Sequence, residues 1–80
     1  MEPRLIVVKA AYDPEARVWY VEDSDLYGLN AEASTIEELR DQLPAIIVDL
    51  LVANKETSER EIPVEIIAHT RTKVRIPAAA

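Results

Sequence analysis

Two runs of hydrophobic residues near the start of the chain have the pattern of paired β-strands. Leu5 to Tyr12 is apolar at most positions, which is typical of a strand covered on both faces. Arg17 to Val21 is rich in aromatic and β-branched residues and predicts a returning strand. Between them, Asp13-Pro14-Glu15-Ala16 is a turn signal, because Asp hydrogen-bonds back to the chain and Pro fixes its φ. Together these segments predict a β-hairpin.

A polar stretch and a short apolar one follow the hairpin. Glu22 to Gly28 is acidic and predicts a loop. Gly28 is the only glycine of the chain, so it marks a backbone position that other residues are expected to tolerate poorly. Leu29 to Ala33 then predicts a short third strand.

The middle of the chain changes to helical spacing. Ser34-Thr35-Ile36-Glu37 fits a capping box, with Ser34 as the N-cap. Apolar residues then recur on one helical face, at Ile36, Leu39, Leu43, Ile46, Ile47, Leu50 and Leu51. Pro44 lies inside this run and cannot donate to the carbonyl of Arg40. We therefore expect either a kink at Pro44 or two helices.

The last part of the chain alternates with a period of two from Ile62. One face carries Ile62, Val64, Ile66, Ala68, Thr70, Thr72, Val74 and Ile76, and the other carries Pro63, Glu65, Ile67, His69, Arg71, Lys73 and Arg75. A strand of that length spans roughly 50 Å, whereas a folded domain of this size has a radius of gyration of about 12 Å. Such a strand has to bend, fray or reach another chain.

These elements predict one α+β domain over residues 1–80 with the order β-β-β-α-β. We expect a core at about 5–68 and a C-terminal strand extension at 69–77. An antiparallel meander is followed by a helix on one face, and the last strand lies parallel to the first in the spatial order 3-2-1-4. One helix shields one face of the sheet, so the second face is expected to meet another subunit.

Composition narrows the functional classes. The chain has no cysteine, which removes disulfides, thiol catalysis and Cys-based zinc sites. No signal peptide is visible, and the longest apolar stretch, Leu43 to Ala53, is too short to span a bilayer. We expect a cytoplasmic protein without a membrane segment.

The net charge is −6, and residues 1–60 carry 13 acidic and 6 basic side chains. That excess favours a basic partner and also aids solubility.

Candidate chemistry is sparse. The single histidine, His69, is expected to be a partly exposed strand residue. A nucleophile–base pair would need a serine near it, but Ser24, Ser34 and Ser58 all fall in turns or caps. Glu22, Asp23 and Asp25 lack the further ligands and the placed glycine of a calcium loop, so a solvated acidic loop is expected. The sequence thus predicts no enzyme, no metal site and no cofactor.

Three cations alternate on the last strand. Arg71, Lys73 and Arg75 could lie along nucleic-acid phosphates as a β-ribbon, or they could protect an edge strand from aggregation. The excess of acidic residues elsewhere favours the protective role.

The order of the segments from Leu5 to Ala68 resembles the HicB-like antitoxin superfamily. The resemblance rests on Asp13-Pro14-Glu15-Ala16, Val18-Trp19-Tyr20-Val21, Ser24-Asp25-Leu26-Tyr27-Gly28-Leu29 and Ser34-Thr35-Ile36-Glu37-Glu38-Leu39. Ser24 and Tyr27 stand where the family's loop has prolines. Only twelve residues follow Ala68, too few for the C-terminal DNA-binding domain of many HicB antitoxins. The chain is therefore similar to the short, stand-alone form.

The resemblance implies a partial ribonuclease H-like fold and a non-catalytic antitoxin that masks a small basic ribonuclease of the HicA type. The expected partner-binding residues are Glu22, Asp23, Asp25, Tyr27, Glu37 and Glu38. The alternatives are a structural homodimer module without a toxin and, third, a β-ribbon nucleic-acid binder.

The chain is expected to associate with itself, as a homodimer or a higher oligomer. The residues expected to form the dimer strand are Thr70, Arg71, Thr72, Lys73, Val74, Arg75 and Ile76.

Overall fold

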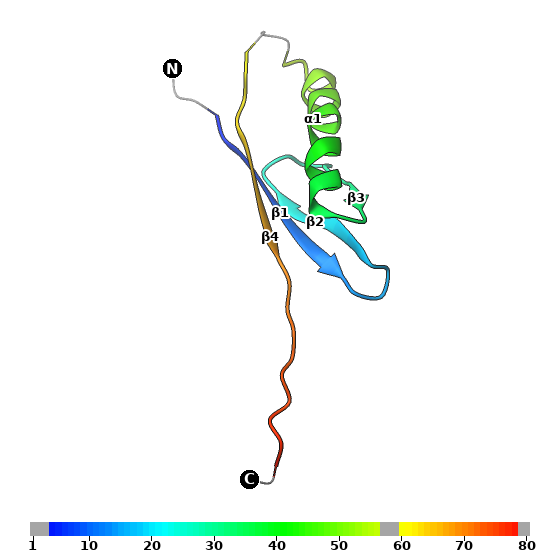
Figure 1. Ribbon diagram of the computed structural model, residues 1–80. Coiled ribbons are helices and arrows are strands. Elements are labelled where there is room, and N and C mark those ends of the chain that lie inside the picture. Colours follow the sequence, from blue (N-terminus) through cyan, green and yellow to red (C-terminus); the bar gives the residue numbers. More distant parts are fainter. Residues whose placement is uncertain (1–3, 57–59, 79–80) are drawn as a thin grey trace.

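The computed structural model describes residues 4–56 and 60–78 of the chain and shows one helix lying on one face of a four-stranded sheet (Figure 1). The elements are β1 (Ile6–Asp13), β2 (Val18–Ser24), β3 (Glu32–Ala33), α1 (Ile36–Ala53) and β4 (Val64–His69). The sheet order is β3-β2-β1-β4, with β1 antiparallel to β2 and parallel to β4. The predicted α+β class, element order and spatial order are confirmed.

The β1–β2 turn forms around Asp13, as the sequence predicts. The Asp13 carboxylate accepts from the backbone N–H of Glu15 at 3.0 Å and of Ala16 at 3.4 Å. The Asp13 carbonyl accepts from the N–H of Arg17 at 2.7 Å, and Arg17 has a φ of 59°. A left-handed residue at this point turns the chain back into β2.

A register shift interrupts the β1–β2 ladder. Lys9 lies opposite Asp23 and Ala10 opposite Val21, so Glu22 is the extra residue of a β-bulge. A bulge bends its strand and redirects the side chain it carries. β2 also continues to Ser24 and includes residues that the sequence placed in the acidic loop.

The third strand is shorter than predicted. β3 comprises Glu32 and Ala33 alone, because Leu26 and Leu29 fold into the core as buried loop residues. The Ser24 hydroxyl donates to the Leu26 carbonyl at 2.7 Å and holds this turn. Gly28 has a φ of +88°, which confirms that the only glycine marks a position unfavourable for other residues.

Helix α1 differs from the prediction at its start and near its middle. Thr35, not Ser34, is the N-cap, and its hydroxyl accepts from the Glu38 N–H at 3.1 Å. The Ser34 hydroxyl instead donates to the Glu38 carboxylate at 2.9 Å. The capping interactions are therefore shifted by one residue. The helix runs as one element through Pro44, so the prediction of two helices is wrong.

The core lies between α1 and one face of the sheet. Leu39, Leu43, Ile47 and Leu51 of the helix pack with Ile6, Val8 and Ala10 of β1 and with Leu26, Leu29 and Ala33. Ile6, Val8 and Leu39 have no exposed surface. Full burial of such a side chain contributes roughly 1.5–3 kcal/mol, so this layer supplies most of the drive to fold.

β4 ends at His69, not at residue 76 as the alternation predicts. Its ladder with β1, its only strand neighbour among the described residues, stops at the pair Ala11–His69, and β1 itself ends two residues later at Asp13. Most of the continuation therefore has no strand to join. Residues 70–78, called here the C-terminal arm, extend past the hairpin as an exposed, irregular segment (Figure 1). The molecule measures 64 × 27 × 19 Å and has a radius of gyration of 16.7 Å, well above that of a compact domain.

Candidate functional site

The face of the sheet opposite α1 brings together side chains that lie far apart in the sequence. Ala11 of β1 pairs with Tyr20 of β2 on one side and with His69 of β4 on the other. Paired residues point to the same face, so these three form one row across the sheet. Ala11 is buried, whereas Tyr20 is half-buried and His69 exposed.

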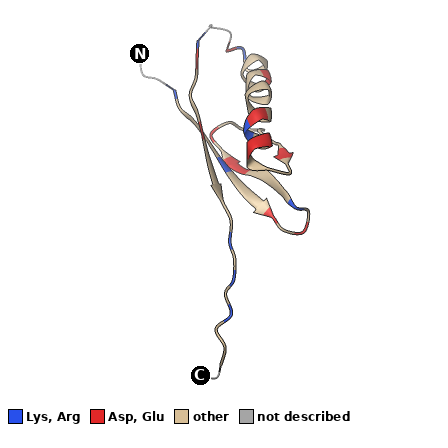
Figure 2. Ribbon diagram, in the orientation of Figure 1, with Lys and Arg blue, Asp and Glu red and all other residues tan. Residues whose placement is uncertain are grey.

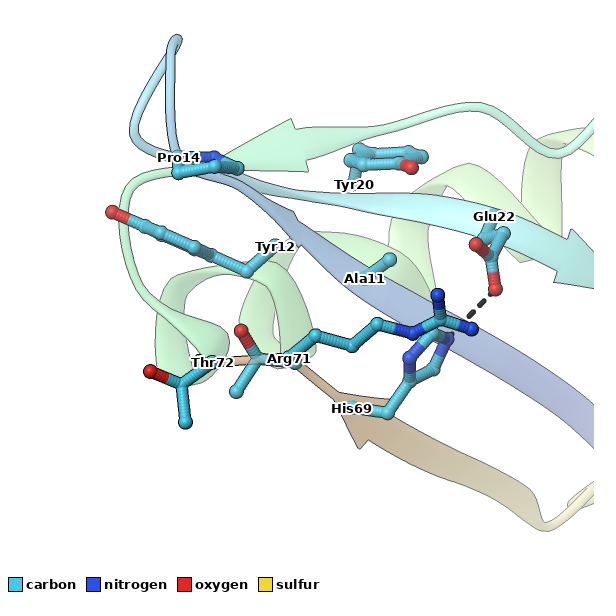
Figure 3. A pocket seen from close by; sticks show the side chains of 9 residues that line it. Ala11, Tyr12, Pro14, Tyr20, Glu22, His69, Arg71 and Thr72 are labelled. Carbon is cyan, nitrogen blue, oxygen red and sulfur yellow. Dashed lines mark hydrogen bonds and ion pairs between the residues drawn. The ribbon is translucent and has the colours of Figure 1, made fainter. Parts of the chain in front are cut away.

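His69 forms a hydrogen bond across this row. Its Nε2 atom lies 2.7 Å from Oε1 of Glu22, the bulge residue of β2 (Figure 3). Both side chains are almost half exposed, at 46% for His69 and 45% for Glu22. His69 is thus a partly exposed strand residue, as the sequence predicts. Its partner was missed, because it depends on the bulge and on parallel pairing 47 residues away.

A hollow of about 630 Å³ lies over this row, between the sheet and the start of the C-terminal arm. Figure 3 shows the Arg71 side chain extending past Ala11 within this hollow, which His69 and Glu22 also line. The rest of the lining is Tyr12, Pro14, Tyr20, Thr70 and Thr72. The hollow offers hydroxyl, carboxylate, imidazole and guanidinium groups that can bond to a protein partner.

The expected partner-binding residues of the acidic stretch have different roles in the structure. Glu22 and Asp23 belong to β2. Asp25 continues the β1–β2 contact: its carboxylate accepts from the Val7 N–H at 2.8 Å, and its own N–H donates to the Val7 carbonyl at 3.1 Å. Tyr27 is 99% exposed, so its ring is free to contact another molecule.

Glu37 and Glu38 lie apart from the acidic loop. Both are in the first turn of α1, whereas the loop meets the second half of the helix, where Gly28 faces Leu50. Twelve residues separate Glu38 from Leu50, which is roughly 18 Å along a helix. Glu37 lines a shallow groove with Ile36, Arg40 and Ile66, on the helix side of the sheet. The six expected partner-binding residues therefore do not form one patch.

The edge strand β4 and the C-terminal arm both carry exposed apolar side chains. Val64 and Ile67 on β4 are 36% and 42% exposed, and Val74 and Ile76 on the arm are each 84% exposed. Arg71, Lys73 and Arg75 alternate with them along the arm (Figure 2). β4 is thus an edge strand. Its continuation to residue 76 has the composition of a strand but pairs with no other strand in the described chain.

Other kinds of site find little support in the described ranges 4–56 and 60–78. They contain no group of three His, Cys, Asp or Glu side chains arranged to hold a metal ion. Their helix is not long and apolar enough to cross a membrane.

Comparisons with known proteins assign the chain a family and a structural relative. Residues 5–78 match the family described as Domain of unknown function (DUF1902). The crystal structure of a hypothetical protein from the extremely thermophilic bacterium Thermus thermophilus is similar, with 36% identity and a TM-score of 0.65. The match covers 91% of this chain and 100% of the other. No curated protein matches.

Proposed function

Since the chain belongs to the DUF1902 family, whose description leaves its activity open, we propose from its surface and its HicB-like sequence pattern that it is a protein-binding domain. It acts as a cytoplasmic antitoxin or an antitoxin-derived module. It binds a small basic ribonuclease of the HicA type, masks the nuclease site and performs no catalysis itself.

The observation that carries this proposal is the charge on the body of the domain. Residues 1–60 hold 13 acidic against 6 basic side chains. No charged side chain is buried in the part of the chain that the structure describes. Acidic residues occur on β2, on β3 and in the first turns of α1 (Figure 2). A negative surface attracts a basic protein, speeds its association and repels nucleic acid.

The start of α1 is the part of this surface best suited to a partner. Glu37 is exposed and lines the groove together with Ile36, Arg40 and Ile66. Ile36 and Ile66 supply apolar contact in the groove, and Glu37 supplies a carboxylate beside Arg40. A basic protein with one apolar anchor would fit this arrangement.

The test starts with purification of the tagged full chain from its native host. We expect a small basic protein to co-purify, to cleave RNA, and to lose that activity when the pure chain is added back. Failure to recover such a protein, or recovery of one whose nuclease activity is unaffected, contradicts the proposal.

A matched pair of variants then locates the surface. Glu37→Gln/Glu38→Gln should weaken binding of the recovered protein more than Glu15→Gln/Asp49→Asn, which removes the same charge at two other exposed positions. Equal losses from the two double variants would mean that net charge alone, not the start of α1, determines the affinity.

The second candidate is a structural homodimer module without a toxin. The exposed edge of β4 and its apolar continuation favour it. A nucleic-acid-binding ribbon formed by Arg71, Lys73 and Arg75 is the third. Tight, salt-sensitive binding of DNA or RNA by the pure chain would favour it over the other two.

A further inference from the structure

We propose that two copies of this chain pair antiparallel through residues 62–76, with the twofold axis at His69. The β4 edge of one copy is then covered by the C-terminal arm of the other, and the two sheets join into one. The occupant of the open edge is thus a second copy of the same chain. This inference goes beyond the proposed function, because it does not depend on any toxin.

The backbone of β4 is prepared for such pairing. The Ile6 N–H donates to the Pro63 carbonyl at 3.1 Å, so the polar groups of odd-numbered residues in β4 point toward β1. Those of Val64, Ile66 and Ala68 point to the open edge, because the direction alternates along a strand. Pro63 within the segment and Pro77 directly after it are both odd-numbered. Neither removes a donor from the outer edge.

Charge then selects the direction and centre of the pairing. Glu65 lies in the first half of the segment, with Glu61 just before it, and Arg71, Lys73 and Arg75 lie in the second half, all on the same face. Antiparallel pairing near the middle places Glu65 of one copy against the basic half of the other. Pairing centred on the arm would set Lys73 against Lys73 and Arg71 against Arg75, which is repulsive.

The apolar residues fix the register. With the axis at His69, Val64 lies opposite Val74 and Ile62 opposite Ile76 of the second copy, and Glu65 lies opposite Lys73. The two most exposed aliphatic side chains of the arm then cover Val64 and Ile62, where β4 borders the core. An axis at Ile67 would instead place Val74 opposite Arg60.

The pairing also uses the bond between His69 and Glu22. At the axis the two His69 residues form a close, non-hydrogen-bonded pair, with Cα atoms about 4.5 Å apart. Each imidazole has its own Glu22 carboxylate at 2.7 Å. The two rings can therefore approach each other with a negative charge beside each of them.

A charge exchange tests the contact between copies. Glu65→Lys and Lys73→Glu should each weaken the dimer about tenfold or more, as measured by sedimentation, because each replaces two attractive cross-strand pairs by repulsive ones. The double variant should restore it. Eight residues of extended chain separate these positions within one copy, roughly 26 Å, so rescue can only arise between copies.

Single cysteines test the register. The chain has no cysteine of its own, and His69→Cys should form a disulfide with its twin, since the Cα separation lies in the range that disulfides need. Ile67→Cys, Arg71→Cys and Lys73→Cys serve as controls and should crosslink far less. Strongest crosslinking at any of these three positions overturns this register. A monomer at micromolar concentration, or no rescue by the double charge exchange, overturns the pairing itself.

Discussion

Nε2 of His69 lies 2.7 Å from Oε1 of Glu22, which joins the edge strand β4 to the bulge of β2 across the intervening β1. The bond crosses the face of the sheet that α1 leaves uncovered. It therefore adds a side-chain link between strands that the backbone ladders already join.

This bond should contribute little to stability. Both side chains are nearly half exposed, so water competes for them, and pairs of this kind contribute about 0.2–1 kcal/mol. We expect Glu22→Gln, His69→Gln and the double variant to give a coupling free energy in that range in a urea-unfolding double-mutant cycle. Glu15→Gln, at the exposed β1–β2 turn, is the control. A coupling of several kcal/mol would mean that the pair is shielded from water, for example by a second copy.

Removing the Thr35 hydroxyl, the N-cap of α1, should destabilise the domain more than removing the neighbouring Ser34 hydroxyl. Thr35→Ala deletes the acceptor for the Glu38 N–H and is expected to lower the free energy of unfolding by about 1 kcal/mol. Ser34→Ala deletes only an exposed bond to the Glu38 carboxylate and should cost less. Urea unfolding of both variants measures the difference. A larger loss of unfolding free energy for Ser34→Ala than for Thr35→Ala would mean that Ser34 is the N-cap, as the sequence pattern predicts.

Pro44→Ala should stabilise the domain. Pro44 lies inside a continuous helix and is exposed, so an alanine adds the missing N–H to Arg40 without altering the core. Pro is about 3 kcal/mol less favourable than Ala in a helix interior, which sets the upper limit of the gain. Thermal unfolding should show a higher midpoint. The matched variant Ala45→Gly, at the next exposed position, should lower it. A lower midpoint for Pro44→Ala would mean that the helix needs the proline to curve over the sheet.

Gly28→Ala should destabilise the domain through the backbone rather than through a clash. An added Cβ would meet Leu50 Cδ2 at 3.9 Å, an ordinary contact, but the φ of +88° is unfavourable for any L side chain. We expect urea unfolding to show a free energy of unfolding that is lower by about 1 kcal/mol or more. Gly28→Asn should lose less, since asparagine adopts positive φ more readily than alanine. Equal stability of all three proteins would contradict this account.

Local signals were sufficient for most of the fold. The Asp13 turn, the helical stripe that ends in Leu51 and the alternation from Ile62 to Ala68 each depend on side chains and backbone within a few residues. The cap was misplaced because Ser34 and Thr35 are both good N-caps, and each has a glutamate three residues later. The structure distinguishes them: the Thr35 hydroxyl accepts from the Glu38 N–H, whereas the Ser34 hydroxyl donates to the Glu38 carboxylate.

The sequence by itself determined the α+β architecture, the order of the strands, the acidic charge and the presence of an apolar continuation after β4. Tertiary structure decided what lies next to what. It joined Glu22 to His69, separated Glu37 from Tyr27, and ended β4 at His69, where its pairing with β1 stops. The physical reason is range: periodicity and capping act over a few residues, whereas a strand exists only where a neighbouring strand can satisfy its backbone.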